Sequence, residues 1–277
     1  MFDSASYGSW KSPITSDLIV STGIRLGSIR LDGPDIYWGE LRPTEGGRQL
    51  VVQCGPEEPL GTVTDITPAS LNVRTRVHEY GGGAYLVHKG VVYFSNFADQ
   101  RLYRQTAGAP PGALTPEVTP AAGLRYADAV VDDQRQRLIC VMEDHRQPGE
   151  AINAIATIPL EGGTPKVLFS GNDLNSSPRL SPDGTELAWI TWNHPQMPWD
   201  GTELWLAKVT EDGSLSRPRR LAGNVKESVC QPCWSPSGTL HFISDATGWW
   251  NLYRWDGECG EPLFPMAAEF AGPQWGF

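Results

Sequence analysis

The sequence predicts an all-β fold built from repeated four-stranded sheets, and two observations carry this prediction. The first is a repeat: Ser177–Thr191 and Gln231–Ser244 each join an alternating run to an aromatic-rich run through a Ser-Pro-Asp/Ser-Gly turn. The second is composition, because 30 Gly and 23 Pro are spread along 277 residues, as many short strands with turns require. Sheet units repeated about every 40 to 55 residues are typical of β-propeller blades.

The same unit can be followed in chain order. Residues 1–16 form an irregular lead-in that we expect to be an arm. The first blade turns at Asp32–Asp35, the second at Lys89-Gly90, and the third, which is the weakest repeat, at Asp132–Arg135. The expected blades span residues 17–54, 61–105, 121–169, 172–223 and 225–265.

The last segment, residues 266–277, is predicted to start a sixth blade. A propeller removes its sheet edges only by packing blades around a full ring. Five blades and a first strand do not complete such a ring. We therefore expect this chain to be part of a longer propeller.

Charge and composition exclude several classes of function. The net charge of −10 and a pI near 5.0 disfavour a nucleic-acid partner, which needs a basic surface. No apolar run approaches the length of a membrane span, and the start lacks a secretory signal. We expect no membrane association and a cytoplasmic location.

The five cysteines, an odd number in a chain of this size, do not indicate a disulfide framework. Cys230 and Cys233 form a C-x-x-C, but no second clustered pair of ligands accompanies it. We interpret the two as small apolar residues on a strand, and we expect no metal and no cofactor.

Several longer segments resemble a known family. They are Tyr7–Thr15, Asp35–Trp38, Val77–Ala84, Trp192–Trp205 and Ser244–Arg254. Through them the whole chain resembles the N-terminal β-propeller of the prolyl-oligopeptidase-type serine peptidases, in the branch of the acylaminoacyl-peptidases and dipeptidyl aminopeptidases. The resemblance implies a seven-bladed ring and an α/β-hydrolase domain that follows in the same polypeptide. It also implies that the chain stops before that domain.

In such peptidases the hydrolase domain carries the serine, aspartate and histidine of the catalytic triad. This chain contains no G-x-S-x-G nucleophile motif, so we assign it no catalytic residue. The resemblance implies a role in gating, in which the propeller admits short peptides and excludes folded proteins.

Two stretches supply candidate residues for the substrate cavity or the domain interface. In Val77–Gly83, three glycines permit close backbone approach, and the resemblance suggests that Glu79, beside Tyr80, pairs with an arginine of the hydrolase domain or a substrate amine. In the Pro-stiffened loop Trp192–Trp199, Trp192, His194 and Trp199 are expected to be exposed at an interface or ligand rim. We expect Trp249-Trp250 to lie in the core.

Three functions follow from these observations. The first is the non-catalytic propeller part of a serine peptidase that acts on short peptides, with the enzyme activity residing outside this chain. The alternative is a free-standing propeller that binds peptide or protein. A sugar-active propeller hydrolase would need paired carboxylates at the central funnel, and the acidic residues here fall mostly in turns.

Overall fold

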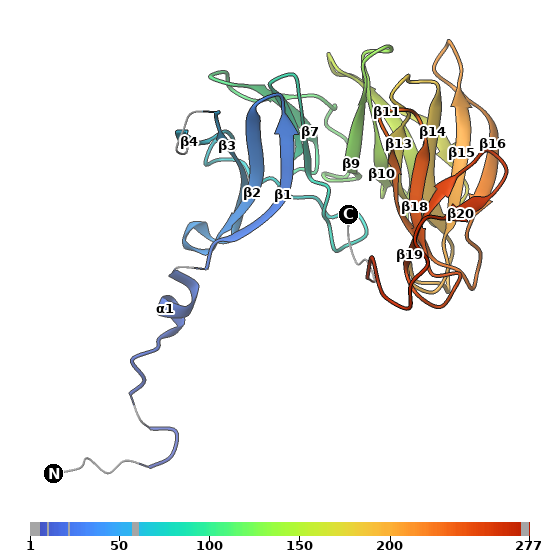
Figure 1. The fold of residues 1–277 in the computed structure, drawn as a ribbon. Coiled ribbons are helices and arrows are strands. Elements are labelled where there is room, and N and C mark those ends of the chain that lie inside the picture. Colours follow the sequence, from blue (N-terminus) through green and yellow to red (C-terminus); the bar gives the residue numbers. More distant parts are fainter. Residues whose placement is uncertain (1–5, 10, 22, 57–60, 273–276) are drawn as a thin grey trace. The chain divides into compact units, whose positions relative to one another are not determined.

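The computed structural model describes residues 6–9, 11–21, 23–56, 61–272 and 277. Within them, five four-stranded antiparallel sheets follow one another along the chain (Figure 1). The helices are the short α1 (Ser16–Ser21) and the 3-10 turn η1 (Pro43–Glu45). This confirms the predicted all-β propeller of four-stranded blades. The chain divides into two compact units, Met1–Pro68 and Ala69–Phe277, which we describe separately as unit 1 and unit 2.

Unit 1 contains the first sheet, with strands β1 (Arg25–Asp32), β2 (Asp35–Arg42), β3 (Arg48–Cys54) and β4 (Val63–Asp65) in sequential order. Arg42 of β2 bonds to the edge strand β4, because its guanidinium donates to both carboxylate oxygens of Asp65 at 2.6 and 2.7 Å. The same guanidinium lies 2.8 Å from Glu40. We expected this blade to end at residue 54, but β4 lies beyond that residue. A strand of three residues carries no recognisable alternation, so the sequence does not indicate it.

Unit 2 contains four sheets, each with its strands in sequential order. The second and third sheets are β5 (Tyr85–His88), β6 (Val91–Ser95), β7 (Leu102–Thr106) and β8 (Gly112–Ala113), then β9 (Leu124–Asp132), β10 (Arg137–Asp144), β11 (Ile152–Pro159) and β12 (Lys166–Ser170). The fourth and fifth are β13 (Leu174–Leu180), β14 (Glu186–Trp192), β15 (Glu203–Val209) and β16 (Leu215–Ala222), then β17 (Val229–Trp234), β18 (Leu240–Ser244), β19 (Asn251–Trp255) and β20 (Gly260–Pro262).

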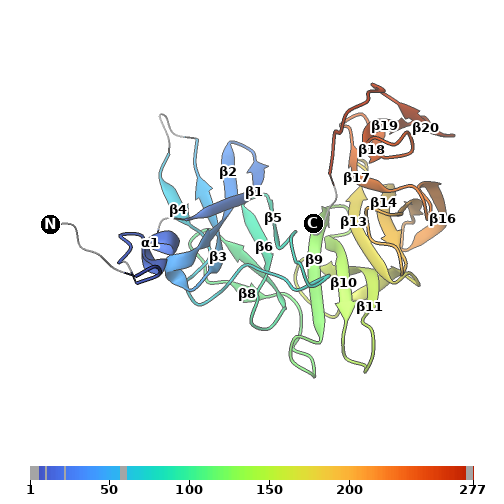
Figure 2. The same cartoon turned by 90° about the horizontal axis from the view of Figure 1, so that it is seen from below.

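The first strands of these sheets lie next to one another. β5 contacts β9, and β13 contacts both β9 and β17 (Figure 2). This is the arrangement of propeller blades, in which the first strand of each blade is the innermost.

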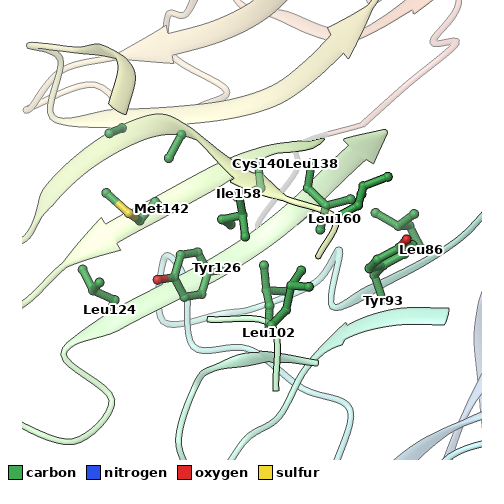
Figure 3. Packing of buried hydrophobic residues seen from close by; sticks show 13 residues of the cluster. Leu86, Tyr93, Leu102, Leu124, Tyr126, Leu138, Cys140, Met142, Ile158 and Leu160 are labelled. Carbon is green, nitrogen blue, oxygen red and sulfur yellow. The ribbon is translucent and has the colours of Figure 1, made fainter. Parts of the chain in front are cut away.

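The core of unit 2 consists of layers between successive sheets. In β10, Leu138, Cys140 and Met142 pack toward the second sheet, in the cluster that Figure 3 shows. The alternate residues Ile139 and Val141 pack toward the fourth sheet. Successive side chains of a strand point to opposite faces, so an unbroken apolar run is the signature of a strand buried on both sides.

Four of the first strands share a second feature, a β-bulge with one residue in the left-handed region. These residues are Ser28, Asp128, Ser177 and Gln231, at φ values of 54°, 48°, 52° and 52°. At Asp128 the bulge also connects sheets, since its backbone N–H donates to the carbonyl of Gly83 at 2.8 Å. Its carboxylate accepts from Arg179 of β13 at 3.0 Å.

The predicted start of a sixth blade, residues 266–277, falls partly on residues 273–276, which lie outside the described residues. The described part of the segment, residues 266–272 and 277, contains no strand. There, Phe270 N–H donates to the carbonyl of Trp250 at 2.8 Å, which ties this stretch to the fifth sheet.

Gly83 offers a test of the close approach between β5 and β9. It has φ +53°, and a Cβ there would lie 2.9 Å from the backbone of Asp128. We expect Gly83→Ala to destabilise unit 2 by about 2 kcal/mol or more, measured by urea unfolding, because backbone strain and overlap add. Gly90→Ala is the matched control, since Gly90 has φ +73° but open space around it. Equal losses in the two variants would contradict the packing argument.

The Asp65–Arg42 pair predicts a pH dependence in unit 1. Hydrogen bonding to Arg42 lowers the pKa of Asp65 below its ordinary value. A lowered folded-state pKa means that the pair stabilises the fold above about pH 4 and loses this contribution as the pH falls through the folded-state pKa. Asp65→Asn is therefore expected to be less stable than wild type at pH 6, by up to about 1 kcal/mol for this half-exposed pair. The gap should close toward pH 3, and the exposed Glu150→Gln should show no such gap in the same urea titrations.

Candidate functional site

A cavity of about 160 Å³ lies in unit 2, at the end of β14 where the fourth and fifth sheets meet. Its inner walls are buried apolar side chains, chiefly Ile190, Trp192 and Val229. Tyr80 and His194 also line it and are exposed, so they mark its rim. The remaining lining comes from residues 174, 176, 177, 196–199, 202, 230 and 250, together with His78 and Phe277.

The loop that connects β14 to β15 covers one side of this cavity, and it is held at several points. Thr202 Oγ1 donates to the carbonyl of Val229 at 2.7 Å and accepts from the N–H of Val229 at 2.6 Å. Ser228 Oγ donates to the carbonyl of Pro198. At the start of the loop, Asp173 accepts from both the backbone and the imidazole of His194, at 2.9 and 3.0 Å. The loop is therefore fixed to the fifth sheet and to the residue that precedes β13.

The turn His78–Glu79 contributes His78 to the cavity lining and is strained. Both residues lie in the left-handed region, at φ 53° and 61°. The buried carboxylate of Glu143 stabilises this conformation by accepting from the backbone N–H of His78 at 2.8 Å. Strained residues held in this way gather at ligand sites and switch regions.

The imidazole of His78 is enclosed by aromatic rings. It meets Trp192 edge to face, with ring centroids 5.3 Å apart, and Phe277 at 4.9 Å. Burial lowers the pKa of His78 below its ordinary value, although the Glu143 carboxylate acts in the opposite direction. His78 is thus held mainly neutral at pH 7.

Glu79 lies apart from the cavity lining. Its carboxylate accepts from Arg125 of β9 at 2.9 Å, and it is largely exposed. Within this chain its cationic partner is Arg125, and the expected pairing with the hydrolase domain or a substrate amine stays a prediction. The buried Glu143 lies 3.8 Å from the same guanidinium, so Arg125 stands between the two carboxylates.

The other four candidates line the same cavity: Tyr80, Trp192, His194 and Trp199. Trp192 differs from the expectation of an exposed loop residue. It is the last residue of β14 and only 7% exposed, because the strand runs further than the Asn-His-Pro sequence suggests. The functional roles of these residues stay predictions.

The expectation for Trp249-Trp250 needs correction, and the place of His78 in the cavity was missed. Trp249-Trp250 was expected in the core, but Trp249 is 41% exposed and Trp250 lines the cavity. This pair precedes β19 and so lies outside the strand in which we expected it. His78 was interpreted as an ordinary loop or strand residue, since no sequence signal places it opposite Trp192.

The chemistry of the cavity favours binding of an uncharged group. None of its lining residues is Asp, Glu, Lys or Arg. Burial raises the pKa of the Cys230 thiol to about 12, so that thiol is protonated at neutral pH. In the described part of the chain, no group of three or more His, Cys, Asp or Glu is placed to hold a metal ion.

The chain was compared with known proteins. No family model and no curated protein matches it. Among solved structures, a puromycin hydrolase matches 99% of this chain with a TM-score of 0.89 and 36% identity. A puromycin-hydrolyzing peptidase from Mycobacterium tuberculosis matches 98% with a TM-score of 0.87 and 42% identity.

The chain belongs to the propeller region of the prolyl-oligopeptidase family. It spans 44% of the length of either puromycin-hydrolyzing relative. Propellers of other function share only its fold, as an oligogalacturonate lyase does at 16% identity and a TM-score of 0.62. None of the described helices is both long and apolar enough to cross a membrane.

The two carboxylates around Arg125 should differ sharply in their effect on stability. We expect Glu143→Ala to destabilise unit 2 by about 3 kcal/mol, because it leaves the buried N–H of His78 and the amide of Asn153 without their acceptor and removes the buried carboxylate beside Arg125. Glu79→Ala removes an exposed partner of the same cation and should cost less than about 1 kcal/mol. Urea unfolding of the two variants checks this, and a larger loss for Glu79→Ala would contradict the assigned roles.

Proposed function

We propose that this chain is the non-catalytic propeller part of a serine peptidase that acts on short peptides and small amides. An α/β-hydrolase domain of the same polypeptide would carry the catalysis. The observation that supports this most is the match of nearly the whole chain, at 36% and 42% identity, to two puromycin-hydrolyzing proteins that are more than twice as long. We further place the protein in the acylaminoacyl-peptidase and dipeptidyl aminopeptidase branch.

The proposed contribution of the propeller is to narrow access to the active site. This role is steric and needs a rigid wall. Sheets buried on both faces supply such rigidity, because close-packed layers resist deformation. We propose that the end of unit 2 with the cavity faces the hydrolase domain, since Tyr80 and His194 expose polar and aromatic surface there.

The alternative is a propeller that binds peptide or protein by itself. The aromatic cavity is the observation that favours it, because a binding module needs such a site as much as a peptidase does. For either function we propose a cytoplasmic location, which the five free thiols support.

A fluorophosphonate label, which reacts with active serines, separates the two functions. We expect an antibody to this chain to detect, in source cells, a labelled polypeptide of roughly twice the 30.3 kDa of this chain. The immunoprecipitated protein should hydrolyse puromycin, and serine labelling should abolish that activity. An unlabelled polypeptide of 30.3 kDa without activity would overturn the peptidase proposal and leave the binding module.

A further inference from the structure

We propose that the cavity between the fourth and fifth sheets is a binding site for a single neutral aromatic ring. Its volume of about 160 Å³ is the first reason. An engineered protein cavity of about 150 Å³ with apolar walls takes up benzene. The cavity described here therefore accommodates one six-membered ring with a small substituent.

The walls supply contacts that suit such a ring. Trp192, Trp250 and Phe277 lie around the space, and Ile190 and Val229 contribute aliphatic surface. Aromatic rings attract one another in edge-to-face and offset geometries beyond the gain from burial. With no Asp, Glu, Lys or Arg in the lining, a charged group inside would lack an ionic partner.

The polar groups are at positions where a ring substituent can reach them. Ser176 and Gln196 are half-buried members of the lining, and Tyr80 and His194 are exposed. Hydroxyl, amide and imidazole groups can donate to or accept from a phenol or ether oxygen. A ring with one such oxygen contacts the apolar walls and also forms a hydrogen bond with the polar groups of the lining.

The site is also formed before a ligand arrives. Its loop is fixed to β17 through Thr202 and Ser228, and the His78 turn is fixed through Glu143. Ordering costs are therefore low, which allows even a small ligand to bind measurably.

The identity of the natural ligand depends on the proposed function. If the chain is part of a peptidase, the ring is an aromatic side chain of the substrate. The capacity to bind a ring does not depend on that function.

The test uses the 277-residue chain and p-cresol, a phenol of suitable size, in a titration followed by ligand-observed saturation-transfer NMR. We expect saturable binding with a Kd near or below about 1 mM. Cyclohexylmethanol, which is apolar but not flat, should bind at least about three-fold more weakly if aromatic contacts matter. The absence of saturable p-cresol binding, or equal binding of the two compounds, would overturn the proposal.

Variants locate the site. Ser176→Phe fills the cavity from β13, where the serine hydroxyl makes no hydrogen bond within the described residues, and should weaken p-cresol at least about ten-fold. Trp250→Ala removes a wall and should also weaken binding. Trp249→Ala is the matched control, because that neighbour is exposed and outside the lining. If Ser176→Phe fails to fold, as circular dichroism would reveal, the tryptophan pair still decides the question.

The outcomes also distinguish this proposal from the proposed function. Binding of p-cresol that Trp250→Ala weakens and Trp249→Ala leaves intact supports the site, even if no serine labelling is found. Serine labelling and puromycin hydrolysis without p-cresol binding would leave the peptidase standing and remove the ring site.

Discussion

The structure of unit 2 depends on one constraint, which is that the middle strands of its third and fourth sheets, β10 and β14, must be covered on both faces. β10 and β14 each contain an unbroken apolar run, Leu138–Met142 and Leu187–Ile190, so a single layer on one side would leave about half of these side chains in water. Trp189 packs toward the third sheet while Ala188 and Ile190 pack toward the fifth. Burial of apolar surface is the main favourable term in folding, and stacking the sheets achieves it on both faces at once.

Stacked sheets also need a way to bring their first strands close together. The bulges in β9, β13 and β17 meet this need, because each inserts a left-handed residue that turns the strand away from its regular path. Asp128 in the bulge of β9 makes hydrogen bonds on both sides of that strand. Its backbone N–H donates to the carbonyl of Gly83, and its carboxylate accepts from Arg179. Trp234 of β17 extends the series by donating to the carbonyl of Arg179 at 2.9 Å. Adjacent first strands are thus joined by specific polar contacts as well as by packing.

Much of this fold can be predicted from the sequence, because repeated turns and apolar runs are local signals. The run Leu138–Met142 indicates a doubly buried strand without any knowledge of its neighbours. The strand β4 and the exposure of Trp249 cannot be predicted in this way, since each depends on which residues pack over a short segment. Of the site, the loop Trp192–Trp199 is recognisable by composition. His78 is not, because its place opposite Trp192 arises from the meeting of segments more than a hundred residues apart.

The contacts that stabilise these segments also explain why a cavity is present. Between the fourth and fifth sheets, Ile190 and Trp192 pack toward Val229, but the following loop does not fold down onto them. Its carbonyl at Pro198 is satisfied by Ser228, and Thr202 makes hydrogen bonds in both directions with Val229. Collapse of the loop onto the apolar side chains would break these hydrogen bonds and leave buried backbone groups without partners, which offsets the gain from burying apolar surface. Glu143 stabilises the left-handed conformation of the His78 turn, and in this conformation the imidazole packs against Trp192. Buried polar contacts around an apolar space, rather than looseness of the fold, are therefore what maintain this site.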